Sequence, residues 1–61
     1  MKIKNIKIQE LRNFGYFGTG FRVTINARDG RIFEAIYTTR PTVEEIQEDF
    51  RENKKSFMHI N

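Results

Sequence analysis

Acid–base chemistry in this sequence would have to use His59 or the carboxylates of residues 44–52. General acid–base catalysis needs a titratable group that its neighbours hold in place within a cleft. His59 is the single histidine and lies close to Asn61, where chains are poorly ordered unless they are tied down. Glu44 and Glu48 have the four-residue spacing of one helix face, which favours a solvated acidic surface over a catalytic pair. We therefore predict that the protein is not an enzyme.

Metal and cofactor chemistry lacks its usual ligands as well. The sequence contains no cysteine, which excludes thiolate catalysis and cysteine-bound zinc and gives no sign of an oxidising compartment. Hard cations such as Ca²⁺ need a loop dense in oxygen ligands, and the acidic residues here follow a helical pattern instead. We predict that no metal or cofactor binds.

The stretch from Asn13 to Phe21 combines three of the four glycines with four of the eight aromatic residues. Its glycines lack the spacing of a dinucleotide-binding loop, and they precede a strand pattern rather than a helix. Glycines free the backbone, and exposed aromatic side chains make good anchors for an interface. The aromatic side chains of this loop either cap a thin core or face a partner, and we favour the partner for Phe14, Tyr16 and Phe17.

Two stretches with strand alternation, residues 21–27 and 31–37, flank Asp29 and Gly30, which is a strong hairpin signal. A two-residue turn would mix polar and apolar side chains on both faces of the hairpin. A type I turn with Gly30 as a left-handed bulge collects the apolar side chains on one face instead. We therefore predict the bulged turn, with the pairs Ile25–Phe33, Val23–Ala35 and Phe21–Tyr37.

The opposite face of this hairpin is half polar, so it is either partly covered or used for binding. It carries Arg22, Thr24 and Asn26 beside Ile32, Glu34 and Ile36.

Residues 2–11 form the first predicted strand. Ile6 and Ile8 share one face of it, whereas Ile3 and Leu11 fall on the other, which predicts a bend or a bulge. A helix is the weaker alternative for this segment, because isoleucines are poor helix formers and Asn5 offers no cap.

A helix is predicted after Pro41. Thr42 and Glu45 have the spacing of a capping box, in which each side chain bonds the other residue's backbone N–H. A narrow apolar stripe at helical spacing, suited to covering one face of a sheet, follows in Val43, Ile46, Phe50 and Phe57. Residues 56–61 alternate again and are either a short last strand or a frayed helix end.

Together these elements predict the α+β class in a single domain, residues 1–61. The expected architecture is a small antiparallel sheet of about three strands, packed by one C-terminal helix, in the order ββα or ββαβ. A chain of about this length buries only ~60% of its unfolded surface, so the core should be thin.

Charge is divided unevenly along the 61 residues, whose net charge is +3. Residues 1–40 hold eight basic and three acidic residues, which gives +5, whereas residues 41–61 hold three and five, which gives −2. Such polarity can steer a molecule toward nucleic acid or toward an acidic patch on a protein. Lysines interrupt any apolar run in the first residues, so we predict no signal peptide, no membrane association and a cytoplasmic location in a bacterial or infected bacterial cell.

The order of hairpin and helix from Phe21 to Glu52 resembles the three-stranded-sheet DNA-binding arms of phage integrases. In that family the sheet enters the major groove, which implies that Arg22, Thr24 and Asn26 would face the nucleic acid. Two residues depart from the pattern, because Glu34 and Ile36 share this face and a carboxylate meets phosphate unfavourably. DNA or RNA binding is therefore the alternative hypothesis.

Very small, cysteine-free α+β proteins of this outline also resemble phage-encoded factors that block a host enzyme or defence complex. That resemblance implies a non-catalytic module that binds and modulates or inhibits a host protein, which is our first hypothesis. A homodimeric structural or assembly protein, paired through sheet edges, is the third. The candidate partner-binding residues are Arg12, Phe14, Tyr16, Phe17, Arg22, Thr24 and Asn26, and the helix offers a second possible surface in Glu44, Glu45, Glu48 and Glu52.

Overall fold

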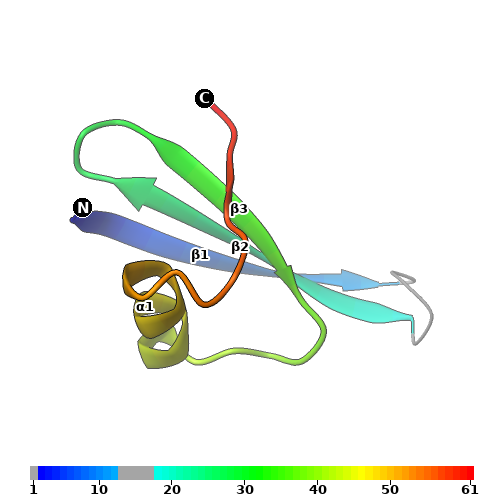
Figure 1. Cartoon of the computed structure of the whole chain (residues 1–61). Helices are drawn as coiled ribbons and strands as arrows, with labels where there is room; N and C mark the ends of the chain where they lie inside the picture. The colour runs from blue at the N-terminus through cyan, green and yellow to red at the C-terminus, as the bar shows by residue number, and fades with distance from the viewer. Residues whose placement is uncertain (1, 13–17) are drawn as a thin grey trace.

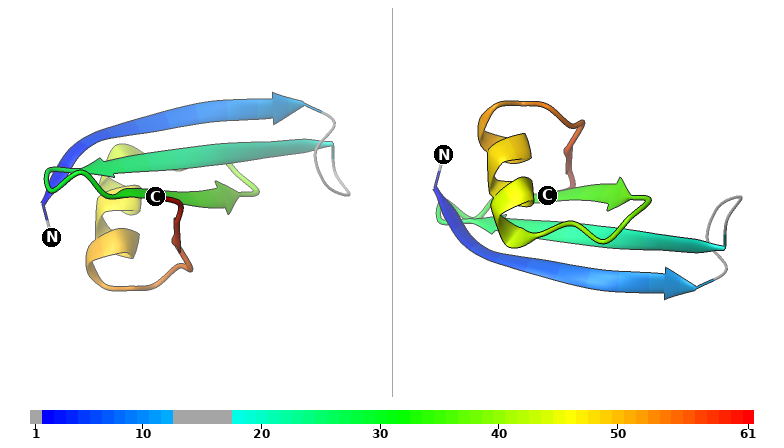
Figure 2. Two further views of the ribbon diagram at one scale, coloured as in Figure 1. Left: turned by 90° about the horizontal axis from the view of Figure 1, so that it is seen from above. Right: turned by 90° about the horizontal axis from the view of Figure 1, so that it is seen from below.

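Four strands and one helix form the molecule in a computed structural model that describes residues 2–12 and 18–61. The elements are β1 (Ile3–Arg12), β2 (Thr19–Ala27), β3 (Ile32–Tyr37), α1 (Val43–Arg51) and β4 (Met58–His59). The strands form one antiparallel sheet in the order β1-β2-β3-β4, and α1 lies against one face of it (Figures 1 and 2). The predicted α+β class is confirmed. The strand order βββαβ replaces the expected ββα or ββαβ, because the first strand and the last both join the sheet.

The β2–β3 hairpin has the predicted bulged turn and register. Ala27 N–H donates to the Arg31 carbonyl at 2.9 Å, and Gly30 N–H donates to the Ala27 carbonyl at 3.1 Å. Gly30 has φ of 97°, a left-handed conformation that side chains other than glycine rarely adopt. The predicted pairs Phe21–Tyr37, Val23–Ala35 and Ile25–Phe33 are all present.

Strand β1 contains the predicted irregularity. Its register against β2 shifts between Ile3, which lies opposite Ala27, and Asn5, which lies opposite Asn26. The shift brings Ile3 to the face that Ile6 and Ile8 share, since these lie opposite Ile25 and Val23. Leu11 lies opposite Gly20 and stays on the other face.

The core lies between the sheet and α1. Val23 and Ile25 from β2 and Ile46 from α1 are 0% exposed, and Ala35 and Tyr37 from β3 complete the buried cluster. Half-buried side chains pack around this cluster, among them Ile3, Ile6, Ile8, Phe21, Phe33, Phe50 and Phe57. The core is thin, as the length of the chain predicts.

The apolar stripe of the helix is shorter than predicted. Helix α1 packs on the core through Ile46 and Phe50, which lie one turn apart. Val43 is 47% exposed at the first helical position, so its predicted place in the stripe is wrong. Phe57 follows the end of the helix and reaches Phe50 from the segment before β4, with ring centroids 5.4 Å apart.

Both ends of α1 are fixed by local hydrogen bonds. The predicted capping box is present: Glu45 N–H donates to Thr42 Oγ1 at 3.1 Å, and Thr42 N–H donates to Glu45 Oε1 at 3.4 Å. After the last turn Asn53 adopts φ of 58°, and Lys54 N–H donates to the Asp49 carbonyl at 2.9 Å. This is the longer bond of a Schellman motif, which ends a helix and reverses the chain.

The C-terminal residues form a strand rather than a frayed helix end. Met58 and His59 pair with Glu34 and Phe33 of β3. Asn61 extends this edge, since its side chain accepts from the Ile32 N–H at 2.7 Å and donates to the Gly30 carbonyl at 3.1 Å. His59 stacks on Phe33 with ring centroids 5.0 Å apart, which gives this histidine a structural role.

Candidate functional site

One face of the sheet carries no helix or strand among the residues that the structure describes (Figure 2). The register places the six hairpin residues singled out from the sequence together on this face: Arg22, Thr24 and Asn26 from β2 and Ile32, Glu34 and Ile36 from β3. Neighbouring strands add Asn5, Lys7 and Gln9 from β1 and Met58 from β4. We call these ten residues the uncovered face.

Arg22 links three strands across the uncovered face. Its Nη2 donates to Gln9 Oε1 of β1 at 2.8 Å, and its Nε lies 4.0 Å from Glu34 Oε2 of β3. On the same face Asn26 Nδ2 donates to Asn5 Oδ1 at 2.7 Å. These contacts connect polar side chains of β1, β2 and β3 across the face.

Apolar side chains lie beside this polar network. Ile32 and Ile36 are half-buried although nothing described packs over them, and Met58 is 68% exposed. An interface with a protein typically combines an apolar centre, arginine and a polar rim. The uncovered face has this mixture, with Glu34 next to its arginine.

The remaining predicted partner-binding residues do not join the uncovered face. Arg12 is exposed and lies opposite Thr19 at the far end of the β1–β2 ribbon, where strand alternation places it on the other face of the sheet. Phe14, Tyr16 and Phe17 lie outside the described residues. The expectation that they face a partner stays a prediction.

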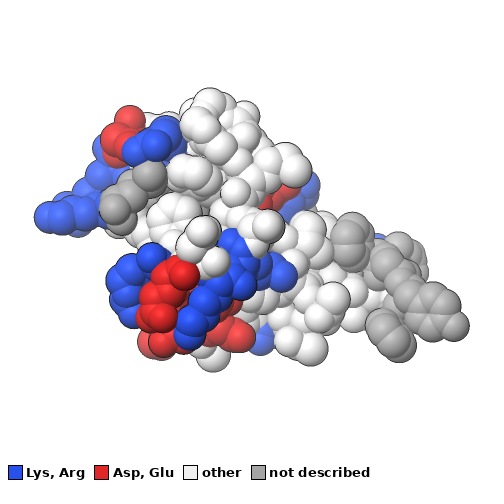
Figure 3. Space-filling model, in the orientation of Figure 1, with Lys and Arg blue, Asp and Glu red and all other residues white. Residues whose placement is uncertain are grey.

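The predicted acidic surface of α1 is partly neutralised by its own neighbours. Lys54 Nζ lies 3.4 Å from Glu48 Oε2 and 3.5 Å from Glu52 Oε1, and this hydrogen bond with Glu48 raises the pKa of Lys54. Glu45 closes the capping box, which leaves Glu44 as an exposed carboxylate with no ion-pair partner among the described residues. Figure 3 shows acidic and basic atoms side by side over the helix. The expectation that Glu44, Glu45, Glu48 and Glu52 form a second partner surface stays a prediction.

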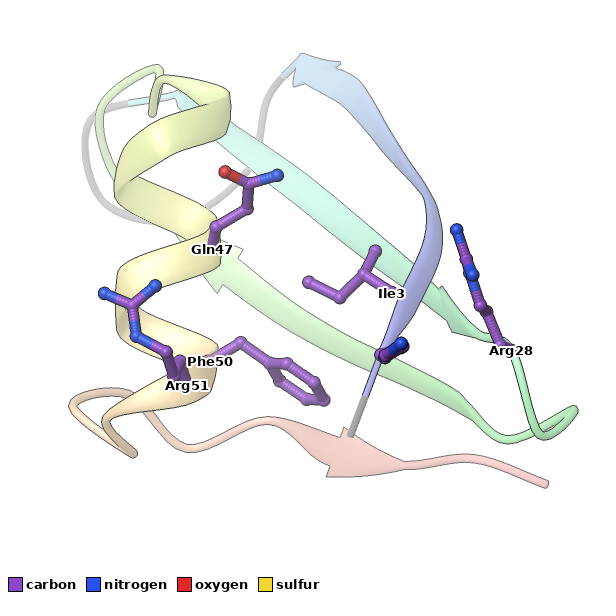
Figure 4. A pocket seen from close by; sticks show the side chains of 6 residues that line it. Ile3, Arg28, Gln47, Phe50 and Arg51 are labelled. Atoms are coloured by element: carbon purple, nitrogen blue, oxygen red, sulfur yellow. The ribbon is translucent and has the colours of Figure 1, made fainter.

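A basic pocket that the sequence did not reveal lies between α1 and the start of β1. Its volume is about 460 Å³ (Figure 4). Ile3 and Phe50 extend into the space between strand and helix from opposite sides. The polar lining consists of Gln47 and three cations, Lys2, Arg28 and Arg51.

The three cations of the basic pocket come from separate parts of the chain. Arg28 belongs to the β2–β3 turn, and its N–H donates to the Lys2 carbonyl at 2.9 Å, which joins the turn to the start of β1. Arg51 ends the helix and contacts Glu52 Oε2 at 3.3 Å. Lys2 and Arg28 have no ion-pair partner among the described residues. No local sequence signal predicts a site whose members meet only in the folded chain.

Structural contacts explain the shifted pKa values of Asp29 and Tyr37. Asp29 accepts from Arg31 Nε at 2.8 Å, and this hydrogen bond lowers the pKa of Asp29 in the hairpin turn. Tyr37 donates its hydroxyl to Asp49 Oδ2 at 2.8 Å, and burial, then this bond, raise the pKa of Tyr37. Neither pair belongs to the uncovered face or lines the basic pocket, so they stabilise the fold.

The described residues contain no group of three His, Asp or Glu side chains that could hold a metal ion. The helix that the structure describes is too short and too polar to cross a membrane. Comparison with protein-family models, curated proteins and solved structures gives no match to this chain. The functional argument therefore depends on the uncovered face and the basic pocket.

Proposed function

We propose that the protein is a non-catalytic module that binds another protein through the uncovered face. The observation that carries this proposal is a sheet face over which no described helix or strand packs, and whose polar side chains contact one another across the strands. Arg22 is held between Gln9 and Glu34, beside the half-buried Ile36. A surface that combines an arginine and a polar network with apolar side chains beside them favours association with a protein.

Glu34 makes a protein the better partner than a nucleic acid. Its carboxylate lies within 4.0 Å of Arg22, the one arginine of the uncovered face, and compensates its charge. Nucleic-acid affinity depends largely on cations that neutralise phosphates, and a carboxylate at the centre of the face works against it. A protein surface can instead offer an acceptor to Arg22 and a donor to Glu34.

The class of partner follows from the resemblance in outline to small phage-encoded factors. We propose that the protein acts in the cytoplasm of a bacterial or infected bacterial cell, where it inhibits or modulates a host enzyme or defence complex. In this proposal the protein acts by covering a surface of a larger protein, because binding alone needs no catalytic cleft.

The test uses the tagged full chain to capture partners from a bacterial lysate treated with nuclease, followed by mass spectrometry. The variant combines Arg22→Ala with Ile36→Glu, which removes the arginine of the uncovered face and adds a negative charge beside it. Because truncation of central interface residues often costs more than 1 kcal/mol each, we expect its affinity for the captured protein to fall at least about tenfold. The matched control is Glu44→Gln on the exposed side of α1.

The capture is informative only together with the variants. Circular dichroism and thermal unfolding establish that both variants are folded. The proposal fails if the Arg22→Ala, Ile36→Glu variant captures the same proteins as the wild type, or if the control loses them equally.

DNA or RNA binding through the same face is the competing hypothesis. It is favoured by Arg22, Asn26 and Gln9, whose side-chain types hydrogen-bond to base edges. This hypothesis predicts a gel shift with generic duplex DNA that weakens steeply as the salt concentration rises. A salt-sensitive shift that Arg22→Ala abolishes, without a protein partner in the capture experiment, would replace our proposal.

A further inference from the structure

Within residues 2–12 and 18–61, no strand pairs with the outer edge of β1. On its other side β1 pairs with β2, as Figure 1 shows. An edge strand presents a row of N–H and C=O groups that can pair with an added strand. The opposite edge of the sheet is different, because β4 and Asn61 cover the first part of β3.

The side chains of β1 divide into a side with three isoleucines, which ends in Glu10 and Arg12, and a mainly polar side with Lys7 between Asn5 and Gln9. Ile3, Ile6 and Ile8 lie on the face toward α1 and are half-buried, so part of each remains open at the edge. Lys7 is exposed on the uncovered face, and Lys4 is exposed at the register shift. An added strand with alternating apolar and acidic residues would match both sides at once.

The same lysines argue against a second copy of this chain as the added strand. Antiparallel pairing of β1 with itself about its middle would place the two copies of Lys7 opposite each other, and like charges directly opposite are destabilising. Lysines on an edge strand are a common means of preventing such self-association. The charge of this edge therefore fits an acidic strand from another protein.

The basic pocket lies at the beginning of this edge. Ile3 belongs both to β1 and to the pocket, where it faces Phe50 (Figure 4). Lys2, Arg28 and Arg51 also line the pocket. An apolar side chain of an added strand can enter the pocket between Ile3 and Phe50. A carboxylate on the same strand can pair with Lys2 or Arg28, which have no ion-pair partner among the described residues. The pocket thus combines apolar and basic side chains, as the edge of β1 does.

We infer that β1 accepts an extended acidic segment of the partner protein by strand addition, with an apolar side chain in the basic pocket. The inference rests on the proposed protein-binding function and adds the chemistry of the partner segment. Backbone hydrogen bonds to β1 provide affinity, and the alternation of apolar and acidic side chains provides specificity.

The test measures the binding of short fluorescent peptides to the full chain by anisotropy. The probe alternates valine and glutamate. One control replaces every glutamate by lysine, and a second keeps the sequence but is N-methylated at each internal residue, which removes the backbone donors and leaves the charges. We expect each control to bind at least about tenfold more weakly than the probe, a difference of ~1.4 kcal/mol.

Amide hydrogen exchange and two variants locate the bound peptide. Binding should slow the exchange of β1 amides and leave the amides of α1 unchanged. Arg28→Glu reverses a charge at the basic pocket and should weaken binding at least about fivefold, whereas Lys54→Glu makes the same change beyond the helix and should have less effect.

Several results would overturn the inference. Equal affinity for the N-methylated peptide would exclude strand addition, and equal affinity for the lysine peptide would exclude an acidic segment. The Arg22→Ala, Ile36→Glu variant separates this inference from the proposed function, because it should retain the probe peptide. If the Arg22→Ala, Ile36→Glu variant loses the captured protein and the wild type does not bind the probe peptide, the inference alone fails. If the probe binds as expected and no captured protein depends on the uncovered face, the proposed function fails.

Discussion

Arg22 is the residue on which the candidate interface depends most. It contacts β1 through Gln9 and approaches β3 through Glu34, so it links three strands at one end of the uncovered face. Its predicted role came from its position in an alternating strand, and the register places it as expected. The contact with Gln9 needed the third strand, which only the folded sheet brings alongside.

Tyr37 is the buried residue whose polar group has the clearest energetic role. Its hydroxyl donates to Asp49 at 2.8 Å and its ring lies 4.5 Å beneath the Lys55 ammonium. Tyr37→Phe keeps the ring and removes the hydrogen bond, so we expect the free energy of unfolding to fall by about 1 kcal/mol. Urea denaturation monitored by circular dichroism measures this change, and an unaltered midpoint would contradict it.

The same residue predicts how stability changes at alkaline pH. Burial and the bond to Asp49 raise the pKa of Tyr37 in the folded state above its ordinary value. Below pH of about 10 the hydroxyl is protonated in both states, and its contribution is fully present. As the pH rises further the unfolded chain loses this proton first, so stability declines. Tyr37→Phe should reduce that alkaline decline, and an identical decline in both proteins would be evidence against this assignment.

At the scale of elements, α1 begins where its capping box dictates. Thr42 and Glu45 exchange two hydrogen bonds between side chains and backbone. Thr42→Ala leaves a helix N–H without its acceptor and should lower the free energy of unfolding by about 1 kcal/mol, or the melting temperature by ~4–8 °C in so small a domain. Thr42→Ser retains the hydroxyl and serves as the control. Thermal unfolding compares the two variants, and equal losses would show that the cap contributes nothing.

At the scale of the whole molecule, β1 is the longest described strand with an unpaired edge, and we infer that its lysines control what can pair there. If Lys4 and Lys7 prevent β1 from pairing with a second β1, their joint replacement by threonine should permit self-association, because threonine favours strands and removes the repulsion. Analytical ultracentrifugation over a range of concentrations should then detect dimers or larger species. The control, Arg31→Gln with Lys54→Gln, removes two positive charges away from the edge. Self-association of the control, or a monomeric Lys4→Thr, Lys7→Thr variant, would refute this function of the lysines.

The sequence by itself determined the parts of the fold that depend on neighbouring residues. The hairpin register follows from the alternation on both sides of Gly30, because a slip by one residue would scatter the apolar side chains. The start of α1 follows from Thr42 and Glu45, and the irregularity of β1 from the spacing of Ile3 and Ile6. Each of these features is fixed by interactions within a few residues or within one hairpin.

Only the tertiary structure decided which surfaces remain open and which distant residues meet. Val43 fits the helical stripe in sequence, but packing reaches only Ile46 and Phe50 and leaves it exposed. The basic pocket exists because the register shift of β1, the β2–β3 turn and the end of α1 converge, and no spacing in the sequence encodes that convergence. Local patterns fix dihedral angles and pairing, whereas a surface is the sum of long-range packing choices, so the uncovered face and the pocket became visible only once the sheet and the helix had been put together.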